Sequence, residues 1–404
     1  MRNVKMDIRY FKKKIKDVKV SDILSVFPMA TAFLLRPLFR RKYRDIWLIC
    51  EEKREARDNG YHFFKYLCEH QPQLDCVYAI DKRCKDYIKV ASLGKTVHHG
   101  SLKHWILYFT AKYNISSQKG GKPNAAMCAF LELNGLFQPR NIFLQHGVTI
   151  SKLDWLMADR CRFDFFVAAT TSEQAFVETA FGYDPDIVHL TGFPRFDNLH
   201  DWKAKKNRII LVPTWRKWLR LHSESTSREE MDFRGSEFLR KWLELLTSSK
   251  LTALIRKYEL DVVFCLHRQM QEYTDMFREA SECITILSSN DCGIQELMKS
   301  AQMMITDYSS VCFDMFYMKK PVIFYQFDEE EYRKRHYEQG WFDYHHNPFS
   351  NSYPDCSSVL EELERCILTD YRVSEQYLDG HRKEFRYYDR RNSERVYEAL
   401  KGLK

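Results

Sequence analysis

Short apolar runs alternate with amphipathic stretches along most of the chain. The runs expected to form strands are residues 45–51, 75–81, 141–145, 164–170 and 186–191 in the first half, and 208–213, 261–266, 283–287, 301–306 and 321–325 in the second. Patterns typical of helices separate them, for example over 56–69, 101–112, 123–136 and 172–181. Nearly continuous apolar strands that alternate with helices are typical of parallel sheets covered on both faces. The pattern therefore predicts an α/β protein with two doubly wound, Rossmann-type sheets.

A polar and basic connector, DWKAKKN at 201–207, separates the two groups of strands. A chain of 404 residues suits two domains, each of about 150–200 residues. We therefore expect one Rossmann-like domain at 45–200, a second at 207–404, and a separate segment at 1–44. Neither half contains GxGxxG or a Walker A sequence, which disfavours a dinucleotide-dependent dehydrogenase and a P-loop kinase.

Positive charge is concentrated in residues 1–44, which contain 13 Lys+Arg against 3 Asp+Glu, whereas the other residues contain 50 against 52. Proteins that bind nucleic acid need a basic surface on the folded body, so we expect no nucleic-acid partner. The apolar stretch 23–35 lies between clusters of Lys and Arg. It is too short to span a bilayer and lacks a signal-peptide cleavage site.

A cationic segment with such an apolar stretch is typical of an interfacial anchor on anionic lipid. The alternative is a helix that docks on the protein and leaves a solvated basic face. Twelve cysteines are scattered along the chain and none forms a CxxC pair. This distribution indicates reduced cysteines in a cytosolic protein and no zinc site.

Ligands of open parallel sheets bind beyond the carboxyl ends of the strands. Histidines, hydroxyls and charged groups follow several of the expected strands: His146 and Gly147, Thr170 to Ser172, Gly192 to Arg195, Thr214 to Arg216, His267 and Arg268, Asp307 to Ser310, and Gln326 to Asp328. We therefore expect the functional site among these residues.

The segment after the strand 301–306 is the most informative of these. The strand ends at Thr306, Asp307 turns the chain, and Ser309 and Ser310 are expected to open a helix. The free N–H groups and the positive dipole end of a helix bind anions, so the two serines suit a pyrophosphate. The alternative is that Asp307 and the serines only cap the helix.

Two histidines also follow expected strands. His146 precedes Gly147, where a glycine permits close approach, and an imidazole can accept a proton from an alcohol near neutral pH. His267 precedes Arg268, which could neutralise phosphate. Either histidine could instead be structural. A metal site is not expected, because the DPD sequence at 184–186 is typical of a turn and His98, His99 and His104 have no acidic residue close by.

Several motifs together resemble the CDP-glycerol glycerophosphotransferases of wall teichoic acid and capsule synthesis. They are QHG at 145–147, TGFPRFDNL at 191–199, VPTWR at 212–216, His267, MITDYSSVCFDMFYMKKPVIFY at 304–325 and FDEEEYRKRHYEQGWFDY at 327–344. The chain departs from the family pattern at Gln145, where a tryptophan is usual, and at 265–268, where CLHR replaces an RPHP-type motif.

The resemblance implies a GT-B-like fold with the active site between two Rossmann domains, peripheral to the cytoplasmic face of a bacterial membrane. The donor would be CDP-glycerol or a related CDP-alditol, with no tightly bound cofactor, and the acceptor a lipid-linked hydroxyl or a growing polymer. It assigns His146 as the base and His267 to the donor phosphates. The other residues expected on the donor side are Thr214, Arg216, Arg268, Thr306, Asp307, Ser309, Ser310 and Asp328, and those on the acceptor side are Gly147, Lys152 and Arg195.

Two other functions remain open from the sequence. A nucleotide-sugar glycosyltransferase of the GT-B type would use the same fold to attack an anomeric carbon. A non-catalytic, membrane-bound partner of a polymer assembly complex would use neither a CDP-alditol nor a nucleotide sugar.

Overall fold

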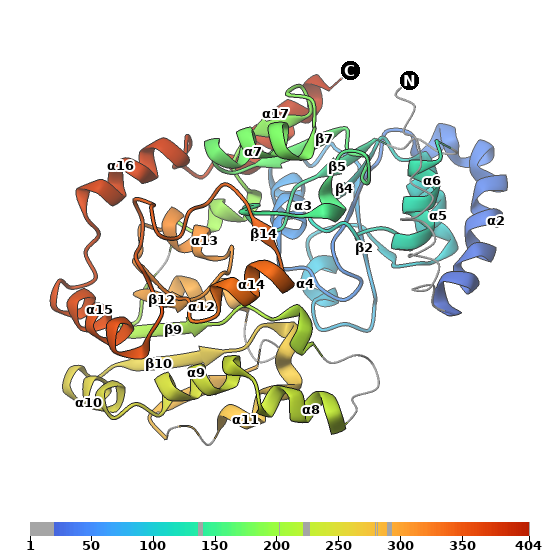
Figure 1. Cartoon of the computed structure of the whole chain (residues 1–404). Coiled ribbons are helices and arrows are strands. Elements are labelled where there is room, and N and C mark those ends of the chain that lie inside the picture. Colours follow the sequence, from blue (N-terminus) through green and yellow to red (C-terminus); the bar gives the residue numbers. More distant parts are fainter. Residues whose placement is uncertain are drawn as a thin grey trace. The chain divides into compact units, whose positions relative to one another are not determined.

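The computed structural model describes residues 20–135, 140–201, 203–220, 227–278, 280, 282–288 and 293–403, and Figure 1 labels many of its elements. The chain forms two units. Unit 1 contains residues up to His146, Asp154–Asp197 and Asp389–Lys404, and unit 2 contains Gly147–Leu153 and Asn198–Tyr388.

Unit 1 is built on a seven-stranded sheet in the order β3-β2-β1-β4-β5-β7-β8. Every neighbouring pair in this sheet is parallel. The strands are β1 Trp47–Cys50, β2 Cys76–Ile80, β3 Thr96–His98, β4 Tyr113–Ser116, β5 Asn141–Phe143, β7 Phe165–Ala168 and β8 Val188–Leu190. All residues of β1, β2 and β7 are buried, as expected for strands covered on both faces.

The helices of unit 1 begin where polar side chains cap their free N–H groups. Asp58, Ser101, Asn124 and Thr170 each accept a backbone hydrogen bond at the start of a helix. The helical elements are α2 Val20–Tyr43, α3 Asn59–His70, α4 Tyr87–Ala91, α5 Leu102–Thr110, α6 Ala125–Leu133, η1 Asp154–Leu156, α7 Thr171–Phe181, η2 Pro194–Asn198 and α17 Asn392–Gly402.

Unit 2 is built on a six-stranded parallel sheet in the order β11-β10-β9-β12-β13-β15. Its strands are β9 Arg208–Val212, β10 Asp261–Cys265, β11 Ile284–Leu287, β12 Met303–Thr306, β13 Val322–Tyr325 and β15 Ser352–Tyr353, and β6 Ser151–Lys152 pairs separately with β14 Glu338–Gln339. The helical elements are η3 Lys217–Leu219, α8 Ser227–Arg234, α9 Glu237–Leu246, α10 Ser249–Tyr258, η4 Arg268–Tyr273, α11 Asp275–Arg278, α12 Ile294–Ser300, α13 Cys312–Tyr317, α14 Glu329–Arg335, α15 Cys356–Leu368 and α16 Glu375–Glu384. The predicted α/β fold with two parallel Rossmann-like sheets is therefore confirmed.

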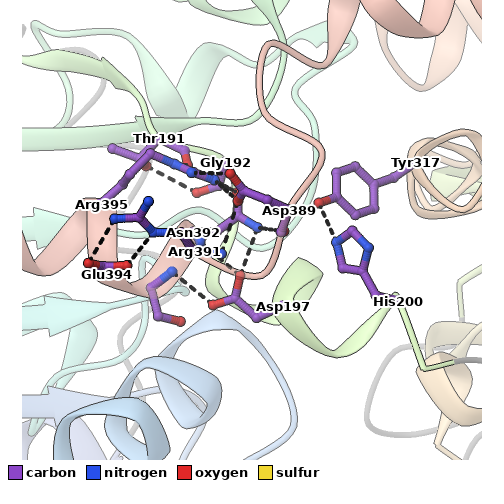
Figure 2. A network of polar contacts seen from close by, with 11 residues as sticks. Thr191, Gly192, Asp197, His200, Tyr317, Asp389, Arg391, Asn392, Glu394 and Arg395 are labelled. Carbon is purple, nitrogen blue, oxygen red and sulfur yellow. Dashed lines mark hydrogen bonds and ion pairs between the residues drawn. The ribbon is translucent and has the colours of Figure 1, made fainter. Parts of the chain in front are cut away.

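The units differ from the expected domain ranges because the chain crosses between them more than once. Residues 389–404 were expected in the second domain but belong to unit 1. Asp197 accepts hydrogen bonds from the backbone N–H groups of Asn392 (2.8 Å) and Ser393 (2.9 Å), and Arg395 donates to the carbonyl of Thr191 (2.9 Å), as Figure 2 shows for this network. The motif at 191–199 thus anchors α17.

Gly192 in that motif has a structural reason to be glycine. Its φ of 77° lies in the left-handed region, and a Cβ atom there would meet Asn392 Oδ1 at 2.0 Å. At the other end of α17, the hydroxyl of Tyr113 on β4 donates to the carbonyl of Leu400 at 2.8 Å. The C-terminal helix is therefore part of the unit 1 core.

The N-terminal apolar stretch is longer in the structure than its composition indicated. It lies within α2, a helix of 24 residues, and the lysines expected to flank it at 12–19 lie outside the described residues. By length and apolar composition, α2 could cross a membrane. The expectation that this apolar segment is too short to span a bilayer therefore does not hold for the helix. One face packs on unit 1 with Ala32, Leu35 and Phe39 against the cluster that contains Trp105.

Candidate functional site

His146 lies beyond the carboxyl end of β5, with its side chain exposed. The residue before it, Gln145, adopts a left-handed backbone conformation with φ of 59°. Its own side chain compensates, since Gln145 Oε1 accepts the backbone N–H of His146 at 2.9 Å. A non-glycine residue in this conformation costs about 1–2 kcal/mol. The turn is therefore held by other contacts.

Arg195 and Asn59 supply those contacts. Asn59 Nδ2 donates to the carbonyl of Gln145 at 2.6 Å, and Asn59 Oδ1 accepts the backbone N–H of Arg195 at 3.0 Å. The guanidinium Nη1 of Arg195 lies 2.9 Å from the carbonyl oxygen of His146 and 3.1 Å from Asp58 Oδ1. Arg195 was expected on the acceptor side; the structure shows a buried side chain that positions the His146 backbone.

Glu51 also stabilises the start of α3, although it is not among the residues expected in the site. Its carboxylate accepts the backbone N–H groups of Arg57 (3.0 Å), Asp58 (3.2 Å) and Tyr61 (2.6 Å), which fixes the segment before α3. Burial, together with the nearby charge of Asp58, raises the pKa of Glu51 to about 8. Glu51 ends the expected strand 45–51, so the rule of strand ends would have identified it.

In unit 2, Arg216 forms a buried clamp with two aspartates. Its side chain is fully buried, and it donates to Asp328 through Nε (2.7 Å) and Nη2 (3.0 Å). Arg216 Nη2 also lies 2.9 Å from Asp307 Oδ2. Burial opposes the positive charge, but Asp307 and Asp328 outweigh it and raise the pKa of Arg216. We name Arg216, Asp307 and Asp328 the buried clamp.

The buried clamp connects the carboxyl ends of three strands. Asp307 follows β12, and its Oδ1 accepts the backbone N–H groups of Thr214, after β9, and of Tyr308, both at 2.7 Å. Arg216 Nη1 donates to the carbonyl of Thr214 at 2.7 Å, and Asp328 lies beyond β13. Desolvation raises the pKa of Asp307, an effect that Arg216 partly offsets.

These contacts show where several of the residues expected on the donor side lie. The nitrogens of Arg216 are engaged inside unit 2, and Thr306 is buried with its hydroxyl bonded to the carbonyl of Val212 at 2.6 Å. The Arg216 guanidinium and the Thr306 hydroxyl are therefore too deeply buried to contact a phosphate from solvent. The structure brings Thr214, Arg216, Thr306, Asp307 and Asp328 together as a scaffold that shapes the loops.

Ser309 and Ser310 lie in a turn before α13 rather than in the helix. The helix begins at Cys312, and the carbonyls of the two serines accept the N–H groups of Cys312 (3.3 Å) and Phe313 (3.1 Å). The alternative, in which Asp307 and the serines only cap the helix, is not observed: the N-cap residue is Val311 and no side chain caps α13. At six residues, α13 is too short for its dipole to define an anion site by itself. The half-buried serine hydroxyls remain beside it.

His267 is half-buried at the carboxyl end of β10, next to exposed Arg268. Its Nδ1 accepts the backbone N–H of Gln269 at 3.2 Å, and its ring stacks with Trp215 at 6.2 Å between centroids. The ring of His336, a residue not expected in the site, lies edge-on to the same Trp215, with 4.5 Å between the centroids. Its Nδ1 accepts the backbone N–H of Lys217 at 3.0 Å.

His336 is held in the neutral state. Burial, together with the charges of Arg216 and Lys217, lowers its pKa to about 3. Since its Nδ1 accepts a hydrogen bond, the ring proton lies on Nε2. His336 occurs in the motif at 327–344, but nothing in that pattern indicates that its ring is buried.

Two expected acceptor-side residues fall in unit 2. Gly147 and Lys152 belong to the segment Gly147–Leu153, and Lys152 Nζ lies 3.5 Å from Glu338 Oε2 across the β6–β14 pair. His146 and Arg195 belong to unit 1. Within the described ranges, no three His, Cys, Asp or Glu side chains gather as a potential metal site.

Comparison with known proteins gives one family match over most of the chain. The family described as CDP-Glycerol:Poly(glycerophosphate) glycerophosphotransferase matches residues 29–402. The minor teichoic acid biosynthesis protein GgaB of Bacillus subtilis is 28% identical over 372 residues, which cover 91% of this chain and 40% of GgaB. The teichoic acid poly(glycerol phosphate) polymerase of Bacillus spizizenii is 25% identical over 318 residues, which cover 68% of this chain and 72% of the polymerase.

Solved structures share the fold at lower identity. The wall teichoic acid polymerase TagF superposes with a TM-score of 0.64 at 16% identity, covering 96% of this chain and 98% of the TagF chain. A UDP-N-acetylglucosamine 2-epimerase from Listeria monocytogenes superposes with a TM-score of 0.55 at 12% identity, covering 89% of this chain and 96% of the epimerase chain. The two-sheet architecture is thus shared by proteins with different chemistry.

Proposed function

This chain belongs to the CDP-glycerol:poly(glycerophosphate) glycerophosphotransferase family of teichoic acid biosynthesis, and on that premise we propose that it transfers glycerol phosphate, or a related alditol phosphate, from a CDP-activated donor to an acceptor hydroxyl. The acceptor is a lipid-linked primer or a growing polymer. CMP is the leaving group.

The exposed side chain of His146, held by its backbone at a strand end, is the observation that supports this proposal. In the proposed reaction the acceptor O–H loses its proton to His146 while its oxygen bonds to the β-phosphorus of the donor. The bond between that phosphorus and the oxygen bridging to CMP breaks, and CMP leaves with the bonding electrons. Transfer of this kind depends mainly on positioning and on charge stabilisation.

The donor role in unit 2 falls to the groups that the buried clamp leaves accessible. These are the hydroxyls of Ser309 and Ser310, the half-buried His267 and the exposed Arg268. The clamp holds the loop at Asp307 and Tyr308 that leads directly into the two serines. In this proposal the buried residues hold the loop in position, and the accessible residues bind the donor phosphates.

The membrane role falls to α2. Ile23, Phe27, Leu34 and Leu38 are exposed at helical spacing, with Phe27 at 81% and Leu34 at 76% exposure. The last turn carries Arg40, Arg41 and Lys42. Because the opposite face packs on unit 1, we propose that α2 lies in the interface of an anionic membrane rather than crossing it.

The deciding experiment incubates the full chain with radiolabelled CDP-glycerol and a lipid-linked acceptor. Release of CMP together with transfer of label supports the proposal. Transfer from a UDP-sugar without use of CDP-glycerol would make the protein a glycosyltransferase instead. If neither donor is consumed while the chain binds membranes, a non-catalytic assembly role would replace the proposal. Parallel reactions with CDP-ribitol distinguish the alditol.

A further inference from the structure

Six exposed cations gather at one end of the unit 1 sheet, and we name them the cationic patch: Lys53, Arg54, Arg57, Lys82, Arg83 and Lys85. They lie in the segments that follow β1 and β2. Those strands are parallel neighbours, so both segments leave the sheet at its carboxyl edge. The backbone N–H of Asp81 donates to the carbonyl of Lys53 at 2.8 Å, which joins the two segments.

Inward-pointing carboxylates hold half of this patch in place. Buried Asp81 pairs with Arg54 (3.4 Å) and Arg83 (3.2 Å), and the hydrogen bonds from Arg83 are the main cause of its lowered pKa. Asp86, also buried, pairs with Arg57 at 3.0 Å. At these two carboxylates solvent therefore meets the arginine and not the acid, whereas Glu52 and Glu55 of the same segment are half-buried.

The three lysines of the patch are charged groups without such partners. In the fully described stretch 51–89 and the rest of the described chain, no carboxylate lies within ion-pair distance of Lys53, Lys82 or Lys85. The arginines are thus ordered by buried acids, and the lysines add exposed positive charge with no carboxylate at ion-pair distance among the described residues.

The cationic patch is structurally continuous with the support of His146. The segment after β1 ends at Asp58, which accepts from the same Arg195 nitrogen that contacts the His146 carbonyl. In the sheet, only β4 separates β1 from β5. Strands are spaced by about 4.8 Å, so the two strand ends are about 10 Å apart. A chain one or a few units long would span that distance.

We propose that the cationic patch binds the phosphodiester backbone of a polyanionic acceptor, upstream of the hydroxyl that reacts at His146. An array of separate cations along an edge matches a chain with one negative charge per unit, and attraction of this kind is dominated by charge. The role of His146 is taken from the proposed function, whereas binding of a polyanion to the patch can be measured without any transfer.

A membrane surface fits the cationic patch less well. Interfacial binding combines cations with apolar side chains that insert among the lipids. Between residues 51 and 89 the one exposed large apolar side chain is Ile88, whereas α2 carries a whole apolar face. We therefore assign the polymer to the patch and the lipid to α2.

The test compares the triple variant Lys53→Gln, Lys82→Gln, Lys85→Gln with wild type in the full chain. The probe is a soluble, fluorescein-labelled oligo(glycerol phosphate), followed by anisotropy. At low salt the dissociation constant should rise about tenfold or more, and its dependence on salt should become shallower. The control Lys103→Gln, Lys112→Gln, Lys401→Gln removes the same charge from exposed lysines of unit 1 and should keep wild-type affinity. Replacing the three patch lysines by arginine should also preserve binding.

Equal affinity of the triple glutamine variant and wild type for the oligomer would overturn the inference. So would loss of binding to anionic vesicles with unchanged oligomer binding, since the patch would then face lipid. In transfer assays, KM for a polymeric acceptor should rise while kcat is retained. If no acceptor is ever modified but oligomer binding still depends on the patch, the inference holds and the proposed function fails.

Discussion

The guanidinium of Arg195 contacts the backbone of His146, with Nη1 at 2.9 Å from the carbonyl oxygen. The same nitrogen lies 3.1 Å from Asp58 Oδ1, so one side chain joins the turn after β5 to the start of α3. His146 itself is exposed, and its backbone is the part that Arg195 holds. We therefore expect Arg195 to position His146 for the proposed reaction.

Replacing His146 by alanine should lower kcat by about 10²–10⁴ and leave donor affinity unchanged, because general-base catalysis contributes about that much. Transfer kinetics and calorimetric titration with CDP-glycerol measure the two quantities. His70→Ala, which alters an exposed histidine on α3, is the matched control and should keep wild-type kcat. A His146→Ala enzyme with wild-type turnover would remove His146 from the mechanism.

Arg195→Met should lower kcat by about 10²-fold, because a shift of about 1 Å in a catalytic group costs that much. Donor affinity and the shape of the pH–rate profile should stay as in wild type, since the base itself is intact. Asp58→Asn should produce a milder loss of the same kind. A displaced pH profile would contradict the positioning role, because it would mean that Arg195 sets the protonation of the base.

Breaking the buried clamp should destabilise unit 2 strongly. Arg216→Met leaves Asp307 and Asp328 buried without their cation, and removal of one partner of a buried ion pair costs about 3–5 kcal/mol. Urea unfolding measures the loss. Arg382→Met, which breaks the exposed pair with Asp379, should change the free energy of unfolding by no more than about 0.5 kcal/mol. Similar values for both variants would show that the clamp is not a stabilising unit.

Acid should destabilise the fold through His336. Its pKa is lowered to about 3 in the folded protein, so between that value and the ordinary pKa of about 6.5 the unfolded chain binds more protons. The contribution of His336 to the free energy of unfolding is therefore fully present above pH 6.5. It falls by at most about 1.4 kcal/mol per pH unit as the pH decreases from 6.5 toward 3. Urea midpoints at about pH 7 and pH 5 should differ less in His336→Gln than in wild type. Identical pH dependence in both proteins would contradict a neutral, buried His336.

Attachment to membranes should depend on the exposed face of α2. Phe27→Ser with Leu34→Ser should weaken flotation with anionic vesicles about tenfold or more without changing thermal stability, since both side chains are exposed. Deleting the helix is a poorer test, because Ala32 and Phe39 contribute to the cluster around Trp105. Leu368→Ser with Ile88→Ser, also exposed, is the control. Undiminished flotation of the α2 variant would assign membrane binding elsewhere.

The sequence pattern predicted the strands that lie in apolar runs and missed β3 and β4, which are more polar or more exposed. The runs around β1, β2 and β9 to β13 contain enough consecutive apolar residues to be recognised. β3 is three residues long and partly exposed at the sheet edge, and β4 reads YNIS, with two polar residues. Such strands form because neighbouring strands supply their hydrogen-bond partners, and that information does not lie in the segment itself.

The candidate site shows a similar limit. Strand ends pointed to Thr214, Arg216, Asp307 and Asp328, and the structure brings these four residues into contact. The sequence pattern does not show that Arg216 is buried, because its partner Asp328 lies 112 positions away in the sequence. His336 escaped notice for the same reason, since its neighbour Lys217 is 119 positions away.

Because α17 packs into unit 1, the order of synthesis differs from the order of assembly. A nascent chain leaves the ribosome with the strands of unit 1 complete at Leu190, but Tyr113 and Asp197 obtain their partners at Leu400 and Asn392 only after all of unit 2 has emerged. Unit 2 can fold while unit 1 still lacks its last helix. Unit 1 therefore stays incomplete while unit 2 is synthesised, which prolongs the time in which its partly folded state can meet chaperones and proteases.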